Sequence, residues 1–409
     1  MRNITSGSAL HNHRAVLVIA PALVLALALA AAGCRDHKAA PPSPAEQAPA
    51  TTTAATDDGG LVDVSAVTAW EQLARRLRAG ERPDLAEYQR LFSLPGQALA
   101  YDQTATRGLK PYVLRNCSEA VFHPEGCLVR KHPKRKDVMD NLAFLKPRLD
   151  ALDTLLTTLR ERRVDREILA LAGQWVPAGR LPPSLAVRLF VGTPSMRYDS
   201  TTQSLLVDAG LALASGPDQL VRMAAANLYR YFVPLQGPEP ARAANGALAA
   251  AAALEKLTRD GVAGWIEDYA DQTFPPDHPL LGRTATQRAG VVSRAAEALP
   301  RLADMVKGAL ADPAELDRNG YAVERYLRLG NRYTELGYAM AALVADRLGE
   351  SALHAAAADP VAFLDTYQRA AAEADAAPGQ LALLEPFPGD VRDAWADLYR
   401  REFPGTTRE

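Results

Sequence analysis

Histidine and cysteine are scarce in this 409-residue chain, and their scarcity limits the metal and redox chemistry open to it. The seven histidines include no pair at H-x-x-x-H spacing, and there are only three cysteines. The sequence also lacks a G-x-x-x-x-G-K-S/T phosphate loop, a G-x-G-x-x-G run after a strand and a G-x-S-x-G serine elbow. These absences argue against nucleotide binding and against the common serine-hydrolase chemistry.

The start of the chain has the charge and hydropathy of an export signal. Residues 1–14 contain Arg2 and Arg14 but no acid, and residues 15–32 run without a charge as AVLVIAPALVLALALAAA. A basic segment followed by an apolar one is typical of a secretory signal. The apolar run is also marginally long enough to span a membrane, so an uncleaved anchor is the alternative.

Cys34 favours the cleaved form. The run Ala31-Ala32-Gly33-Cys34 resembles the lipobox of bacterial lipoproteins, although Ala31 stands where Leu is usual. We therefore expect residues 1–33 to be a signal peptide and Cys34 to carry the lipid, with palmitate as an acyl chain. The next residue is Arg35, and the lack of Asp there implies the outer membrane of a Gram-negative host, facing the periplasm.

Residues 34–60 have the composition of a tether. They are dominated by Ala, Pro, Thr and Gln, as in APPSPAEQAPATTTAATDDGG, and hold no apolar set to bury. We expect this segment to be disordered and to connect the lipid to a folded domain over residues 61–409. That domain is long for a single core but fits a helical protein with subdomains.

The charge balance excludes a generally basic nucleic-acid binder. Removing the leader takes away Arg2 and Arg14, which leaves 44 Lys and Arg against 48 Asp and Glu, a net charge near −4. The run RKHPKRK at residues 130–136 is a local exception. A solvated loop is the ordinary interpretation of such a run, and contact with lipid headgroups or lipopolysaccharide phosphates is the alternative.

Cys117 and Cys127 remain once Cys34 carries the lipid. An oxidising periplasm favours a disulfide between them, and Pro124 and Gly126 allow the chain between them to turn back. Such a short loop closure stabilises a fold by roughly 2–3 kcal/mol. The alternative is a thiol metal site with His123 or His132, although the nine-residue gap is not the tight spacing of zinc sites.

Helical periodicity dominates the folded domain, so we predict a mainly α (α+β) fold. The segments Ala186–Gly192 and Ser204–Asp208 are instead rich in apolar and β-branched residues, and they predict a small sheet. We expect a helix from Pro217 to Phe232 and a single long helix over Ala322–Leu348. Asp359 and Pro360 predict the N-cap and first turn of a later helix.

Three segments carry a resemblance. A strand ending in LLVD leads to the helix DQLVRMAAANLYRYF, then LEKLTRDGVAGWIED, and RYTELGYAMAALVADRLGESAL precedes DPVAFLDTYQ. Their order is similar to that of a gluzincin-type family of bacterial zinc-dependent peptidases with an H-E-x-x-H motif. The resemblance covers roughly half of the chain after the leader. It implies a zincin-like core over residues 185–270, with the small sheet beside the metal-site helix.

In that family two imidazoles of H-E-x-x-H bind one zinc ion, and the Glu activates the metal-bound water. The corresponding positions of this chain are Ala226, Asn227, Leu228, Tyr229 and Arg230, and the third ligand position is Asp260. Ala226 offers no ligand atom, Asn227 no base, and Arg230 is a permanent cation. The resemblance therefore implies a degenerate motif without catalytic residues or zinc.

Further site residues follow from the resemblance. The segment Ser204, Leu205, Leu206, Val207 and Asp208 is a candidate edge strand that pairs with an extended peptide, with Tyr229 and Tyr333 beside this groove. An ion pair between Arg230 and Asp260 is predicted to fill the former metal position. Tyr333 also falls where such peptidases can place a residue near the oxyanion.

Three interpretations remain open from the sequence. The first is a non-catalytic binding or scaffolding protein of the cell envelope, without a cofactor, that contacts a membrane through its lipid and a peptide or envelope protein, but no nucleic acid. The second is an active zinc-dependent peptidase with unconventional ligands, such as Asp260 with His278 or His354. The third is a helical envelope protein unrelated to peptidases.

Overall fold

The computed structural model describes residues 61–102, 110–124, 135–278, 281–282, 288, 290–312, 314–373, 381 and 383–405. The chain divides into two units, residues 1–55 and 56–409, and every element below belongs to the second. The predicted signal peptide, Cys34, the tether, Cys127 and most of the 130–136 basic run lie outside the described residues. The lipid and the disulfide therefore stay predictions, and Cys117 is described as a buried residue of α4.

The strands form one mixed sheet in the described part of the chain. Its strands are β1 (Val62–Asp63), β2 (Ala186–Phe190), β3 (Met196–Asp199) and β4 (Ser204–Asp208). Their order is β1-β2-β4-β3, with β2 parallel to both β1 and β4 and with β3 antiparallel to β4. The two strands predicted from apolar runs are confirmed. The sequence analysis missed β1 and β3, which are short or only half-buried.

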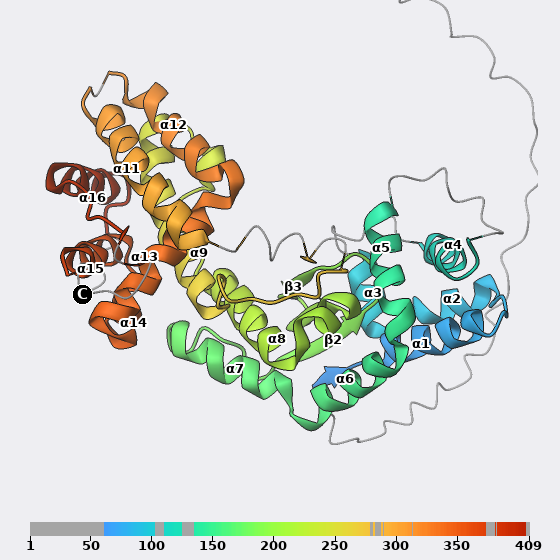
Figure 1. Ribbon diagram of the computed structural model, residues 1–409. Helices are drawn as coiled ribbons and strands as arrows, with labels where there is room; N and C mark the ends of the chain where they lie inside the picture. Colours follow the sequence, from blue (N-terminus) through green and yellow to red (C-terminus); the bar gives the residue numbers. More distant parts are fainter. Residues whose placement is uncertain are drawn as a thin grey trace, which may run out of the picture. The chain divides into compact units, whose positions relative to one another are not determined.

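Helices lie between β1 and β2 and after the last strand of the sheet (Figure 1). Those before the inner strands are α1 (Ser65–Arg78), α2 (Leu85–Leu91), α3 (Pro95–Asp102), α4 (Pro111–Phe122), α5 (Lys136–Leu145), η4 (Lys146–Arg148), α6 (Leu149–Glu161) and α7 (Val164–Trp175). Those after it are α8 (Ala209–Phe232), η5 (Pro240–Arg242), α9 (Gly246–Ile266), α11 (Val291–Leu310), α12 (Leu316–Arg328), η6 (Leu329–Asn331), α13 (Arg332–Leu348), α14 (Glu350–Ala356), α15 (Pro360–Ala372) and α16 (Gly389–Glu402). The prediction of a mainly α, α+β fold is confirmed.

Side-chain caps and left-handed residues set the ends of these helices. Asp84 and Glu87 form a reciprocal capping box at α2, and Asp359 accepts hydrogen bonds from the first turn of α15 as predicted. The single helix predicted over Ala322–Leu348 is wrong. Gly330 and Asn331 have φ angles of 66° and 64°, and these left-handed residues separate α12 from α13.

Helix α9 runs through the centre of the helical half. Its alanine-rich sequence is buried on nearly all sides, as expected for a helix that is apolar all round. It packs on α8, α12, α13 and α16. Glycines allow the closest of these contacts: a Cβ on Gly261 would lie 2.4 Å from the backbone carbon of Gly337 in α13. The backbones of α9 and α13 therefore touch at this crossing.

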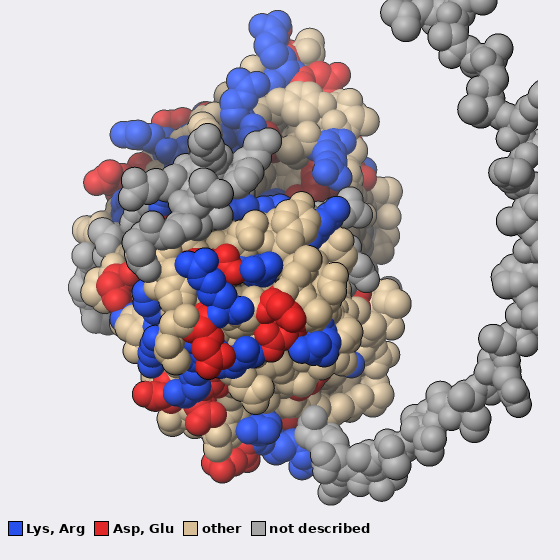
Figure 2. Space-filling view, turned by 90° about the vertical axis from the view of Figure 1, so that its right-hand side faces the viewer, with Lys and Arg blue, Asp and Glu red and all other residues tan. Residues whose placement is uncertain are grey.

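The face that carries α1, α2 and α4 presents basic and acidic side chains that are intermixed (Figure 2). Ion pairs of Arg75 with Glu71 and Asp150, and of Arg76 with Glu81, contribute to this mixture. Exposed pairs of this kind stabilise a fold by at most about 1 kcal/mol each. Within the described residues, no helix combines the length and the hydropathy that a membrane crossing needs.

Candidate functional site

The helix that carries the motif positions starts at the sheet. Asp208 ends β4 and accepts hydrogen bonds from the backbone N–H groups of Gly210 and Leu211, so it is the N-cap of α8. Gly216, with φ 70° and ψ 170°, breaks α8, and Pro217 starts its second part, as the sequence predicted. The five motif positions lie near the end of this second part.

Two of the five positions are filled by apolar packing. Ala226 and Leu228 have no exposed surface and belong to the main core. Tyr229 is 1% exposed, and its hydroxyl donates a hydrogen bond to the carbonyl of Ala357 at 3.1 Å, while burial raises its pKa. Tyr229 was predicted to line a groove, but its side chain is enclosed between α8 and the end of α14. That prediction is wrong.

Arg230 forms an ion pair, but with a different partner from the predicted one. Its Nη1 donates to Oε2 of Glu267 at 3.1 Å, and among the described residues it forms no ion pair with Asp260. Burial acts to lower the pKa of Arg230, but Glu267 and then Asp260 outweigh it and raise that pKa. Arg288 lies on the other oxygen of Glu267, with Nη2 at 4.0 Å from Oε1.

Glu267 was missed by the sequence analysis, although a signal for it exists. It follows Asp260 by seven residues, close to two helical turns, so both carboxylates project from similar faces of α9. Glu267 is also the C-cap of α9, where the helix dipole disfavours a negative charge. Its two arginine partners compensate for that position.

Asp260 has its own cations. Lys256 Nζ lies 2.9 Å from Oδ2, and Arg259 Nε lies 3.3 Å from Oδ1. Glu239 joins this group through Lys256 at 3.5 Å and Arg259 at 3.8 Å. Asp260 is 8% exposed, so its carboxylate is largely enclosed by this network. Both oxygens that could bind a metal are therefore already in contact with fixed positive charges.

Tyr333 lies near the same network. It is 4% exposed, and Lys256 Nζ is 5.4 Å from the centre of its ring. Its hydroxyl has no hydrogen-bond partner among the described residues, and burial raises its pKa. An unpaired buried hydroxyl costs free energy, so packing alone does not explain why a tyrosine stands at position 333.

The predicted groove at β4 is wrong. Ser204, Leu205, Leu206, Val207 and Asp208 are all buried, and β4 pairs with β2 on one side and with β3 on the other. A strand with both edges paired offers no hydrogen bonds to a peptide. Three consecutive apolar residues, Leu205, Leu206 and Val207, are typical of a central strand rather than of an edge strand.

The described sheet has two edge strands, β1 and β3, of which the longer is β3. Its residue Tyr198 packs against the end of α8, with its ring centre 4.7 Å from that of Tyr231 and 5.1 Å from that of Phe232. Tyr231 is 45% exposed. An unpaired strand edge beside exposed aromatic rings has the chemistry of a peptide-binding surface.

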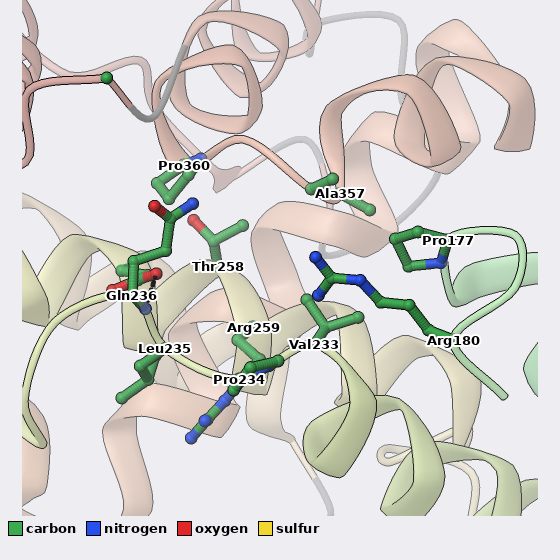
Figure 3. Close-up of a pocket in the computed structure, with 13 residues that line it drawn as sticks. Pro177, Arg180, Val233, Pro234, Leu235, Gln236, Thr258, Arg259, Ala357 and Pro360 are labelled. Carbon is green, nitrogen blue, oxygen red and sulfur yellow. Dashed lines mark hydrogen bonds between the residues drawn. The ribbon is translucent and has the colours of Figure 1, made fainter. Parts of the chain in front are cut away.

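A cavity of about 500 Å³ lies on the other side of the end of α8 (Figure 3). Glu255 fixes its wall, because its carboxylate accepts hydrogen bonds from the backbone N–H of Gln236 at 2.6 Å and of Gly237 at 3.3 Å. Arg180 extends over the opening toward Val233, whereas Arg259 points away from it. Because the carboxylate of Glu255 is occupied by these backbone N–H groups and Arg259 points away, the cavity defines no chemistry by itself.

The helix pair α8–α9 packs with α13 and borders a small mixed sheet, and together they form a mainly α domain. The chain belongs to the family described as "Putative zinc dependent peptidase (DUF5700)", whose profile matches residues 88–376. The match includes α8, α9 and α13, and so every motif position. No curated protein and no solved structure matches the chain.

The residues that the resemblance places at metal-ligand positions do not fit a zinc ion. Zinc is bound by thiolates, neutral imidazoles or carboxylates. Ala226 has no donor atom, Arg230 is a cation held on Glu267, and Asp260 is in contact with Lys256 and Arg259. Within the described ranges, no three His, Cys, Asp or Glu side chains are grouped to hold a metal ion. No catalytic step through zinc is derived for this chain.

Proposed function

We propose that this chain is a lipid-anchored protein of the outer membrane, facing the periplasm, that binds extended peptide segments without zinc catalysis. The observation that carries the proposal is the ion pair of Arg230 with Glu267 at 3.1 Å. It sets a guanidinium at a position where the family carries a metal ligand. The exposed edge of β3 and the ring of Tyr231 support peptide binding.

The second candidate is an active zinc-dependent peptidase with unconventional ligands, which family membership favours. His278 and His354 were the candidate ligands for it. His278 packs on Phe144 with ring centres 4.5 Å apart, and His354 packs on Trp175 with ring centres 3.7 Å apart. Neither joins Asp260 in a ligand group of the described residues. The third interpretation, a protein unrelated to peptidases, is set aside by family membership.

Metal analysis of the purified protein separates the two candidates. We expect well under one zinc per chain after incubation with equimolar zinc, and no chelator-sensitive hydrolysis of unfolded casein. The triple variant Ala226→His, Asn227→Glu, Arg230→His is the matched comparison, because it restores the two imidazoles and the Glu. It should gain zinc affinity if α8 and α9 keep the family geometry. Stoichiometric zinc in the unsubstituted protein would sink the proposal.

Peptide binding is tested with reduced, carboxymethylated casein as an unfolded probe. Tyr231→Ala should weaken binding about tenfold, because an exposed aromatic anchor contributes about 1.4 kcal/mol or more. Tyr112→Ala is the control, since Tyr112 is 52% exposed and lies on α4. Equal affinity of both variants for casein would contradict a peptide surface at β3.

The anchor has its own test. Cys34→Ser should abolish incorporation of labelled palmitate and release the protein from the outer-membrane fraction, while Cys117→Ser should leave both unchanged. Labelling that persists in Cys34→Ser would refute the lipid proposal.

A further inference from the structure

A second cavity, of about 870 Å³, lies between α11, α12 and α13. Its size is that of a pocket for a small organic ligand. Four arginines line it: Arg288, Arg294, Arg301 and Arg332. The lining contains two acids, Glu297 and Glu335, so its charged groups sum to a net charge of plus two.

Two of these guanidinium groups are held in place. Arg288 lies over the ring of Tyr269 at 4.2 Å, and Arg332 lies over the ring of Tyr326 at 4.3 Å. Arg332 Nη1 also donates to the carbonyl of Tyr326 at 3.0 Å. Stacking on an aromatic face fixes the plane of a guanidinium and leaves its charge available to a ligand.

The acids of the lining balance only part of this charge. Glu335 pairs with Arg294 at 3.0 Å. Arg301 is exposed and forms no ion pair with any described residue, and the same holds for Glu297, one turn before it on α11. Arg301 and Arg332 therefore form no ion pair with a described carboxylate, and the unpaired Glu297 offsets only one of their two charges.

A further positive charge lies at the buried side of the cavity. Glu267 is shared by Arg230 at 3.1 Å and Arg288 at 4.0 Å, so one carboxylate faces two cations. Arg288 is 14% exposed in its side chain, and its Nε and Nη1 are buried without a hydrogen-bond acceptor among the described residues. A buried guanidinium that is only partly neutralised destabilises the fold, and an anion beside it lowers this free-energy cost.

We propose that this cavity, which we call the arginine pocket, binds a small organic anion with at least two carboxylate or phosphate charges. Arg301 and Arg332 contact the ligand's oxyanions, since guanidinium groups match both carboxylate and phosphate geometry. Arg288 contributes its charge from beneath. The arginine pocket is separate from the β3 edge, so this inference does not depend on the peptide-binding proposal.

Calorimetric titration of the purified protein with citrate, succinate and inorganic phosphate tests the inference. We expect citrate or phosphate to bind with a dissociation constant that rises at least tenfold in the double variant Arg301→Gln, Arg332→Gln. A tenfold change corresponds to about 1.4 kcal/mol, and each substitution removes a charge-assisted hydrogen bond to the anion. Preference for citrate identifies a polycarboxylate ligand, and preference for phosphate identifies a phosphate ester; either supports the arginine pocket.

Arg325→Gln is the control, because Arg325 is an exposed residue of α12 that does not line the cavity. It removes one positive charge nearby and should change the affinity by less than about twofold. Three outcomes overturn the inference. They are no heat of binding with any of the three anions, equal binding by the double variant, and equal weakening by Arg325→Gln.

Discussion

Asp208 and Glu267 are both buried carboxylates at helix ends, but their partners differ in kind. Asp208 begins α8, where the helix dipole favours a negative charge, and its partners are neutral: three backbone N–H groups and the side-chain amide of Asn141. Glu267 ends α9, where the dipole disfavours the charge, and its partners are the cations Arg230 and Arg288. A carboxylate at the C-terminal end of a helix, such as that of Glu267, is stabilised there because cations lie beside it.

This difference explains what each region does in the fold. Burial raises the pKa of Asp208 to about 7, against its hydrogen bonds, so this carboxylate acts as a cap that tolerates a proton. Glu267 needs a positive charge beside it. In this chain Arg230 supplies that charge from a position that the resemblance assigns to a metal ligand. The motif region, residues 226–230, is therefore held by an ion pair between side chains of this chain.

The largest effect is expected from Glu267→Gln. This change leaves Arg230 and Arg288 close together without their carboxylate, and it should lower the free energy of unfolding by about 3 kcal/mol. Urea unfolding measures the loss. Glu297→Gln removes an exposed acid of α11 and should change the same quantity by less than about 0.5 kcal/mol. Losses of equal size in the two variants would show that the ion pair contributes little.

A smaller effect, dependent on pH, is expected at Asp208. Its folded pKa of about 7 lies above its usual value of 3.8, so the native state holds a proton that the unfolded state has lost. The contribution of this group to stability is present at low pH and falls by about 1 kcal/mol per unit as pH rises from 5 to 7. Asp208→Asn does not titrate. The difference in unfolding free energy between wild type and this variant should therefore shrink over that range; a constant difference contradicts the assignment.

The smallest effect is expected from Lys256→Gln. The side chain of Lys256 is 21% exposed, and Asp260 keeps Arg259 as a partner when Lys256 is removed. We expect a loss of less than about 1 kcal/mol in urea unfolding. A loss as large as that of Glu267→Gln would mean that the network at Asp260, rather than the pair at Glu267, stabilises the motif region.

Local chemistry made parts of the fold predictable from the sequence. The apolar segments of β2 and β4, the restart of α8 at Pro217 and the cap at Asp359 each depend on neighbouring residues only. The order of the strands could not be predicted in this way, because the edge position of β3 depends on its pairing with β4. Apolar and polar side chains alternate in β3, but over four residues only, which is a short signal for a strand.

The residue types at the candidate site could be predicted from the sequence, but their ion-pair partners could not. The sequence shows no histidine at 226 or 230, and the family match confirms the resemblance to this peptidase family. The choice of Glu267 over Asp260 as the partner of Arg230 depends on the separation and rotation of α8 and α9. Lys256 and Arg259 also form ion pairs with the carboxylate of Asp260. Their competition with Arg230 for this carboxylate depends on the packing of the helices.

The contact between the backbones of Gly261 and Gly337 fixes where residue 260 lies in the fold. The residue next to a backbone contact cannot be moved by repacking side chains, because no side chain separates the two helices there. Substitution can change what position 260 carries, from carboxylate to amide or alkyl, while its place in the fold stays the same. A glutamate at 260 would need one replacement and no rearrangement of α9, because the contact between the two glycines fixes the path of the helix backbone there.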